Sequence, residues 1–482
     1  MPRKLRLLLL PVVFFLLLAA SLYLGSDHLS HQIWLLVENG YYGALKGASG
    51  VPSGVSSEEL PITWDAKPTP NTPTSTVPVP VPLNVGGATP TPTATILNGT
   101  VLDSYVKAIL DPAVTDLPRL ECPALNTTRY DPLLKNIIPD HETNSGQIDY
   151  FFALDLRNCL PLLPRLLGSI VEAIRFLGPE RCALSIVEGN SPDGTGEVLA
   201  ALQQAFLDEL PGLAHYYFYQ HSLLDPAEGE RIRRLAELRN LALQPLVSNL
   251  TGHVSQNTTI LFLNDVAACT EDILELALQR RQLGADMTCA MDWTYVGLDP
   301  TFYDVWIAHT INGDSFFEVP ADGNWNSAWN LFWNEPTTRQ RYAGHLPFQV
   351  FSCWNGATAI SAAPLLEGLR FRSADTKKGE CEQGEPQLFC KDLWFRGYNK
   401  IAVVPSVHLE YSNEAAEKIK KLKGYTGDLV RDKKEEENKI EWAGPPDKVK
   451  CMPTWDSQFW RPWNETLIQE EKGTRGETEG GA

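Results

Sequence analysis

The stretch TILFLND at residues 259–265 decides the fold expected for this chain. Its apolar residues run without alternation, which is typical of a strand buried on both faces in a parallel sheet covered by helices. The run ends at Asp265, and open α/β sheets bind ligands at the carboxyl ends of such strands. Asp265 is therefore placed where a hard metal ion could join the protein to a diphosphate. The alternative is a helix cap or turn residue.

The preceding sequence has the order of a parallel sheet. Strands are expected at residues 148–154, 182–187 and 215–219, with helices at 162–177 and 196–210 between them. This β-α-β-α-β order predicts an α/β domain with a mostly parallel sheet flanked by helices. No GxGxxG follows the first strand and no GxxxxGK[ST] occurs, so dinucleotide-dehydrogenase and P-loop functions lose their main support.

Strands are also expected at residues 285–293 and 400–407, with a helix at 271–283 after Asp265. Asp292 lies near the end of the first of these strands. The flat rings of tryptophan suit the apolar faces of sugars, but tryptophan is also common in protein cores. The Trp-rich stretch comprises Trp325, Trp329, Trp333 and Trp354.

Two further groups of charged residues are candidates for binding a ligand. Glu188 and Asp193 lie in a loop after the second strand, where they could bind a ligand or form turns and caps. The helical pattern around Arg234 and Arg239 concentrates positive charge in a chain of net charge -18. Guanidinium groups bind phosphates in bidentate fashion, although a solvated charged face is the alternative. We expect Arg239 to contact a diphosphate, or else Glu188 or Asp193.

Two acids near the carboxyl end of the chain are candidates for catalysis. Glu385 and Asp392 lie before and within an aromatic helix. Either could orient or deprotonate an acceptor hydroxyl, and solvated surface acids are the alternative.

The first hundred residues predict a membrane anchor and a stem. Residues 1–6 are basic, and residues 7–24 are apolar and uncharged, which favours an uncleaved signal-anchor with the following chain in the lumen. A cleaved signal peptide is the alternative. Residues 25–100 include a Pro/Thr-rich segment that we expect to be extended, before a globular domain at 101–465 and a disordered tail at 466–482.

Sequons and cysteines agree with a lumenal domain. Glycosylation is expected at Asn98, Asn126, Asn249 and Asn464, whereas Asn257 lies close to a buried strand. The nine cysteines lack paired metal spacing, so some should form disulfides with at least one left over. Cys381 and Cys390 are the best local pair, but the connectivity stays open.

Seven motifs in order resemble the fungal capsule-associated, cryptococcal α-1,3-mannosyltransferase-like proteins, which form glycosyltransferase family 69. The resemblance covers roughly residues 150–411. The motifs are SIVEGNSPDGT at 185–195, RLAELRNLAL at 234–243, ILFLNDV at 260–266, CAMDW at 289–293, FYDVW at 302–306, FSCWNG at 351–356 and CKDLW at 390–394.

The resemblance implies a GT-A-type fold, a divalent cation such as Mn²⁺, and a type II Golgi membrane protein that moves mannose from GDP-mannose to a glycan. It places Asp265 at the last acid of the metal-binding DxD-equivalent. It assigns Glu188 and Asp193 to the donor loop and Arg239 to the basic helix. It matches the family's later acidic positions to Asp292, Asp304, Asp314, Glu385 and Asp392. The sequence departs from the family at residues 309–310, where an Arg is expected, and at His408, for which a structural role is expected.

The expected function is therefore that of a metal-dependent glycosyltransferase with no nucleic-acid partner. Two alternatives remain: a catalytically inactive membrane-anchored scaffold in polysaccharide synthesis, and a glycoside hydrolase that uses two carboxylates.

Overall fold

The structure is a computed structural model that describes residues 97–135, 146–297 and 299–467. The expected anchor, almost all of the stem and most of the expected tail lie outside these ranges. Within them, no helix is both long and apolar enough to span a bilayer.

A ten-stranded sheet forms the centre of the described domain. Its strand order is β3-β2-β1-β4-β9-β5-β10-β8-β7, with β6 paired to β5. The strands are β1 (Tyr150–Leu156), β2 (Cys182–Glu188), β3 (Tyr217–His221), β4 (Thr259–Leu263), β5 (Met287–Val296), β6 (Asp299–Phe302), β7 (His309–Thr310), β8 (Phe348–Ser352), β9 (Ala357–Ser361) and β10 (Ile401–Leu409). A separate antiparallel pair comprises β11 (Lys448–Thr454) and β12 (Ser457–Pro462).

The sheet is mixed. Strands β1 to β4 are parallel to one another, and β5 and β10 are parallel to each other. Strand β9 runs antiparallel to both β4 and β5. It separates the two parallel groups while leaving their carboxyl ends at the same edge.

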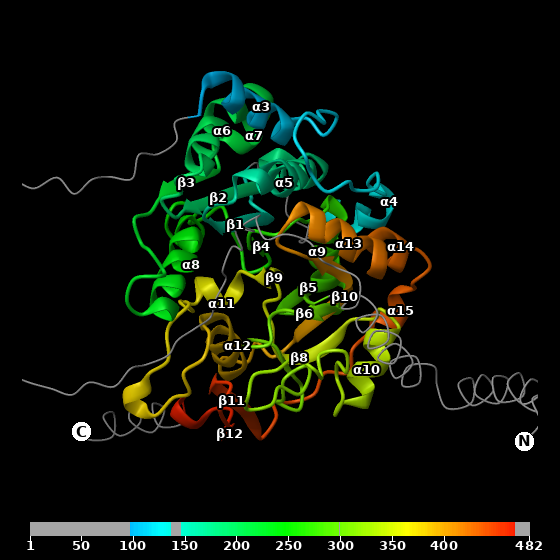
Figure 1. Ribbon diagram of the computed structural model, residues 1–482. Coiled ribbons are helices and arrows are strands. Elements are labelled where there is room, and N and C mark those ends of the chain that lie inside the picture. Colours follow the sequence, from blue (N-terminus) through cyan, green and yellow to red (C-terminus); the bar gives the residue numbers. More distant parts are fainter. Residues whose placement is uncertain (1–96, 136–145, 298, 468–482) are drawn as a thin grey trace, which may run out of the picture. The chain divides into compact units, whose positions relative to one another are not determined.

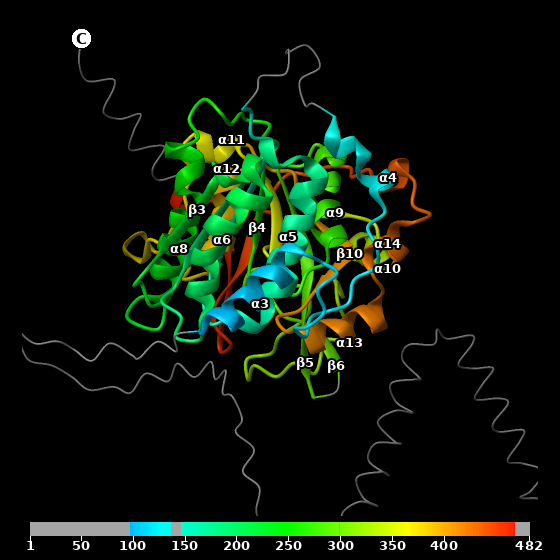
Figure 2. The same ribbon diagram turned by 90° about the horizontal axis from the view of Figure 1, so that it is seen from above.

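Helices cover both faces of this sheet (Figures 1 and 2). The longer helices are α3 (Gly99–Leu110), α5 (Leu163–Leu177), α6 (Thr195–Glu209), α8 (Arg231–Ser248), α9 (Thr270–Leu283), α10 (Pro336–Ala343), α12 (Glu385–Phe395) and α13 (Asn413–Lys423). The shorter helices are α4 (Thr127–Tyr130), α7 (Pro211–Ala214), α11 (Ala363–Leu366), α14 (Thr426–Val430) and α15 (Glu435–Asn438). The 3₁₀ turns are η1 (Asp131–Leu134), η2 (Leu160–Leu162), η3 (Pro179–Arg181) and η4 (Thr376–Lys378).

Strand β4 shows why the apolar run has no polar alternation. Leu261 and Leu263 pack into the buried cluster that contains α5, α6 and α9. Ile260 and Phe262 point to the other face, into the cluster that contains α8 and α12. Because successive side chains of a strand alternate in direction, a strand covered on both faces must be apolar at every position.

The elements expected from the sequence are present with small shifts at their ends. β4 occupies residues 259–263, and α5 begins one residue later than expected. The register of β10 shifts between Val403 and His408, and Pro405 in that interval lacks the N–H that a continuous ladder needs.

The disulfides correct one expectation. Cys381 bonds to Cys451, not to Cys390, and the other two pairs are Cys122–Cys269 and Cys289–Cys353. Cys390 is a buried free thiol, as are Cys159 and Cys182. The sequence separation of 70 residues between Cys381 and Cys451 explains why a local search missed the pair.

Candidate functional site

The carboxyl edge of the sheet gathers acidic side chains from several strands. Asp155 lies near the end of β1, Glu188 ends β2, Asp265 follows β4 and Asp292 lies within β5. Asp304 joins them from the segment after β6. Because parallel strands present their carboxyl ends at one edge, residues far apart in the sequence converge there.

Burial makes the ionised form of these acids unfavourable, and nearby positive charge does not fully offset this effect. It raises the pKa of Asp155, Asp265 and Asp304 to about 6 in each case. Asp155 raises the pKa of Asp265 further by repulsion, whereas the Arg239 guanidinium lowers it. A second positive charge at this edge would therefore be stabilised by several carboxylates.

Asp292 is the most deeply buried acid of the group, at 0% exposure. Its Oδ2 accepts a hydrogen bond from the Tyr411 hydroxyl at 2.6 Å, and its Oδ1 is buried with no partner among the residues that the structure describes. Burial and then repulsion from Asp304 raise the pKa of Asp292 well above its usual range. Direct contact between Asp292 and a donor, as expected from the sequence, would require this buried group to become accessible.

Arg239 is a buried cation close to the acids of this edge. Its Nε donates to Glu385 Oε1 at 2.8 Å, and its Nη1 donates to Asn264 Oδ1 at 3.4 Å. Its guanidinium lies 4.4 Å from the ring centroid of Trp354. The structure thus pairs Arg239 with Glu385 and Asn264, and not with Glu188 or Asp193 as one of our expectations had it.

The two acids that were expected in a donor loop, Glu188 and Asp193, are held by neighbouring protein groups. Glu188 is 1% exposed; its Oε1 accepts from the Ser191 N–H, and its Oε2 lies 2.6 Å from His221 Nδ1. Asp193 accepts from the Thr195 and Leu160 backbone N–H groups. Both acids thus have partners within the protein, and their expected contact with a donor stays a prediction.

Arg234 is partly buried at the start of α8. Its Nε is buried and has no hydrogen-bond partner in the described part of the chain. The hydrogen bond from Arg157 is the largest cause that lowers the pKa of Asp225, and the charge of Arg234 lowers it further. Arg234 stays a candidate for binding an anionic ligand.

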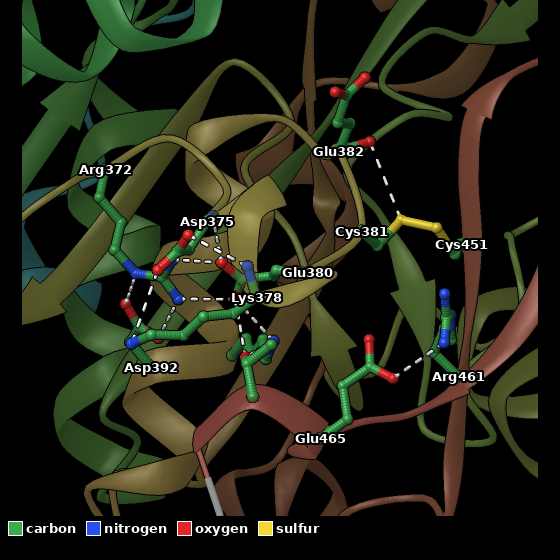
Figure 3. Close-up of polar contacts among 12 residues, drawn as sticks. Arg372, Asp375, Lys378, Glu380, Cys381, Glu382, Asp392, Cys451, Arg461 and Glu465 are labelled. Atoms are coloured by element: carbon green, nitrogen blue, oxygen red, sulfur yellow. Dashed lines mark hydrogen bonds and ion pairs between the residues drawn. A yellow bond between two sulfur atoms is a disulfide. The ribbon is translucent and has the colours of Figure 1, made fainter. Parts of the chain in front are cut away.

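Glu385 and Asp392 have separate surroundings although they share one helix. Glu385 begins α12 and is 2% exposed beside Arg239. Both oxygens of Asp392 accept hydrogen bonds from Arg372, which also binds Glu380 (Figure 3). Arg372 thus holds the Asp392 carboxylate by two hydrogen bonds, and the expected action of Asp392 on an acceptor stays a prediction.

Three consecutive residues in the connection between β8 and β9, residues 354–356, form hydrogen bonds with residues of the site. Trp354 Nε1 donates to Asn264 Oδ1 at 2.9 Å, and the Asn355 N–H donates to Asp304 Oδ2 at 3.0 Å. The Gly356 carbonyl accepts from the Asn264 N–H at 2.9 Å. Gly356 has a φ of +82°, and a Cβ there would lie 3.1 Å from Val266 and 3.4 Å from the Asp292 Cβ. Glycine fits this position on both counts.

Exposure separates the residues that a ligand can reach from those that support them. Asp155, Asn264, Asp265, Asp304 and Tyr411 are partly exposed. We did not single out Asp155, Asn264 or Tyr411 as site residues from the sequence. The rule that selected Asp265, an acid at the end of a buried strand, would also have selected Asp155.

The acids suit a divalent cation in chemistry but do not form a closed metal site. Among the described residues, no group of three or more His, Cys, Asp or Glu side chains is arranged to hold a metal ion. A cation that arrives with a diphosphate needs only one or two carboxylates, because phosphate and water oxygens complete its coordination. The partly exposed Asp265, the acids with raised pKa and the unpartnered Asp292 Oδ1 fit such a cation.

Other candidate residues lie elsewhere. His408 is buried and accepts a hydrogen bond from Trp293 Nε1 at 3.1 Å, in agreement with a structural role. Three of the expected glycosylation residues, Asn98, Asn126 and Asn249, are exposed, and Asn464 is partly buried. The Asn98 side chain also caps α3 by accepting from the Val101 N–H.

Comparison with known proteins defines the class of this chain. Residues 149–392 match the family described as Cryptococcal mannosyltransferase 1. The chain is 36% identical over 357 residues to the alpha-1,3-mannosyltransferase CMT1 of Cryptococcus neoformans var. neoformans serotype D, covering 69% of this chain and 75% of that protein. The chain is a glycosyltransferase.

Specifically, it belongs to the Cryptococcal mannosyltransferase 1 family. Solved structures overlap more weakly. The mannosyltransferase PcManGT of Pyrobaculum calidifontis, in complex with GDP-Man and Mn²⁺, gives a TM-score of 0.31 at 12% identity, over 70% of this chain and 75% of that one. S. aureus TarS in complex with UDP-GlcNAc gives 0.30 at 14% identity, over 55% and 58%.

Proposed function

We propose that this protein is a divalent-cation-dependent α-mannosyltransferase that moves mannose from GDP-mannose to a hydroxyl of a glycan acceptor. The observation that carries the proposal is that Asp155, Asp265 and Asp304 lie together at the carboxyl edge of the sheet. The family to which the chain belongs includes an α-1,3-mannosyltransferase. The α-1,3 linkage is that of this relative, and we propose the same linkage here.

Asp265 is the residue proposed to hold the cation, because it is the partly exposed carboxylate directly after β4. The cation, probed as Mn²⁺, would supply positive charge to the diphosphate leaving group. Arg239 holds Glu385 and Asn264 in place through its hydrogen bonds. Asn355 holds Asp304 through its backbone N–H. These contacts fix the acids before a ligand arrives, so little reorganisation is needed on binding.

The buried contacts of Glu385 decide which role we propose for it toward the acceptor. Glu385 remains in the site, but Arg239 occupies one of its oxygens. We therefore assign Glu385 to positioning Arg239 and assign no acceptor base.

Release of GDP from a panel of nucleotide sugars, with and without Mn²⁺, tests the proposal on the purified lumenal domain. We expect turnover with GDP-mannose that a chelator abolishes and Mn²⁺ restores. A folded protein that binds GDP but turns over no nucleotide sugar would support the inactive-scaffold alternative. Cleavage of glycosides without any affinity for GDP would support the hydrolase alternative.

We also propose a single-pass type II location in the Golgi membrane, with the catalytic domain in the lumen. The three disulfides support an oxidising compartment, because such bonds are rare in the cytosol. The basic flank, the apolar residues 7–24 and the sequons support the orientation.

A further inference from the structure

We propose that the side-chain amide of Asn264 donates a hydrogen bond to an oxygen of the nucleotide sugar, and that Trp354 and Arg239 hold the amide in the orientation that this bond requires. The inference deepens the proposed function and rests on it. It assigns a substrate-binding role to a neutral residue between the end of β4 and the expected cation ligand Asp265.

The orientation of the amide follows from the chemistry of its two neighbours. Trp354 Nε1 lies 2.9 Å and Arg239 Nη1 3.4 Å from Asn264 Oδ1. An indole and a guanidinium can only donate hydrogen bonds. A flipped amide would set its NH₂ group against two donors, so the oxygen must face them. The NH₂ group therefore points away from both.

Burial indicates what lies on that other side. Trp354 is 1% exposed and Arg239 is 7% exposed, whereas Asn264 is partly exposed. The oxygen thus faces the protein interior. Within the described part of the chain, Nδ2 donates to no protein acceptor and is not a buried unpartnered atom. Its two N–H groups remain for a ligand or for water.

The backbone of Asn264 is fixed as well. Its N–H donates to the Gly356 carbonyl at 2.9 Å, and its carbonyl accepts from the Val266 N–H at 2.9 Å. The amide is thus held from the main chain and from its oxygen at once. A donor group held in advance binds a ligand at lower entropic cost than a mobile one.

The position selects the ligand. Asn264 is next to Asp265, where a cation would meet the diphosphate of the donor. Phosphate and hydroxyl oxygens of a nucleotide sugar are both acceptors for an amide N–H. The inference names this shared chemistry, and comparison of GDP with GDP-mannose distinguishes the two sources.

Two substitutions of Asn264 test the bond. Asn264→Asp keeps an oxygen for Trp354 and Arg239 but removes both N–H groups, and Asn264→Ala removes them without adding charge. We expect the KM for GDP-mannose to rise about tenfold in both variants, as for the loss of one hydrogen bond to a charged or polar group. An equal loss of GDP affinity assigns the bond to the diphosphate, and unchanged GDP affinity assigns it to the sugar. The melting temperature of each variant shows whether it is folded.

Trp354→Phe tests the orienting role. The ring stays, but the donor that fixes the amide is lost, so we expect a smaller rise in KM in the same direction. The same change combined with Asn264→Ala, which leaves no amide for Trp354 to orient, should add no further rise, because Trp354 would act only through Asn264. Trp394→Phe is the matched control: Trp394 is 5% exposed and its Nε1 donates to the Phe351 carbonyl at 2.8 Å. We expect its KM to be unchanged.

Three results would overturn the inference. Folded Asn264→Ala and Asn264→Asp with wild-type KM would show that the amide only braces the site. Equal effects of Trp354→Phe and Trp394→Phe would show general loosening of the core. A wild-type protein that binds no GDP would instead remove the proposed function itself, and the inference with it.

Discussion

The substitution Arg239→Lys separates a buried brace from a phosphate ligand. Arg239 is 7% exposed, and its Nε–H donates to Glu385 at 2.8 Å while its guanidinium lies over Trp354 at 4.4 Å. Lysine keeps the charge but cannot reach Glu385 and Asn264 together in the planar geometry of a guanidinium. We therefore expect the main effect on the free energy of unfolding.

The magnitude follows from the contacts. A hydrogen bond to a charged group contributes about 1.5–3 kcal/mol, and breaking a buried pair outright costs about 3–5 kcal/mol. Because lysine keeps part of the interaction, we expect a loss of about 2–4 kcal/mol. At about 2.1 cal/mol/K per residue, a domain of this size would lose roughly 3–5 °C in melting temperature.

The assay measures thermal unfolding and GDP affinity by calorimetry on one preparation. The shorter Trp354 bond still fixes the Asn264 amide, so we expect GDP affinity to change by less than about threefold. The matched control is Arg233→Lys on the same helix, where the side chain is 52% exposed and, within the described residues, pairs with Glu230 and Glu237. It should change neither quantity. An unchanged melting temperature together with tenfold weaker GDP binding would refute a structural role for Arg239. It would instead support direct contact between Arg239 and phosphate.

Three further predictions concern charge, disulfides and topology. Asp265→Asn should remove most Mn²⁺-dependent turnover; near-normal turnover with unchanged dependence on Mn²⁺ would count against a cation at this residue. Because the folded pKa of about 6 exceeds the unfolded value, the ionised Asp265 destabilises the metal-free protein as pH rises from about 4 to above 6. The same variant should therefore melt higher than the wild type at pH 8 and equally at pH 4, as a thermal scan at both pH values can show. Cys381→Ser or Cys451→Ser should cost about 2–5 kcal/mol in urea unfolding, and a milder effect than that of Cys390→Ser would contradict the observed pairing. Protease added to sealed microsomes should spare the domain if residues 7–24 are an anchor, and digestion without detergent would reverse that topology.

The sequence predicted the central elements well because burial on both faces leaves a simple pattern. The apolar run of β4 matches the strand residue for residue, since each position faces one of two buried clusters. The acid at its end was expected at the carboxyl edge for the same reason. Such local patterns depend only on neighbours along the chain.

The partners of the charged groups could not be predicted in the same way. Arg239 meets Glu385, 146 residues away, and Asp392 meets Arg372 in a loop with no regular pattern. Composition shows that a basic helix exists, but only packing decides which arginine turns inward. The amide of Asn264 is a similar case, because its role depends on two donors from distant segments.

The direction of β9 has a consequence for the substrate range of this family. Because β9 lies between β4 and β5, the strands that carry Asp265 and Asp292 are two strand spacings apart, or about 9.5 Å. The strand between them begins, rather than ends, at this edge, and the connection that leads into it supplies the Asn355 N–H to Asp304 and the Gly356 carbonyl to Asn264. This uncharged connection therefore constrains the acids without contributing one, because a change in it would move Asp304 or crowd Asp292. We therefore expect relatives that accept different sugars to keep the residues that correspond to 353–356 as well as the carboxylates, and to differ in other segments.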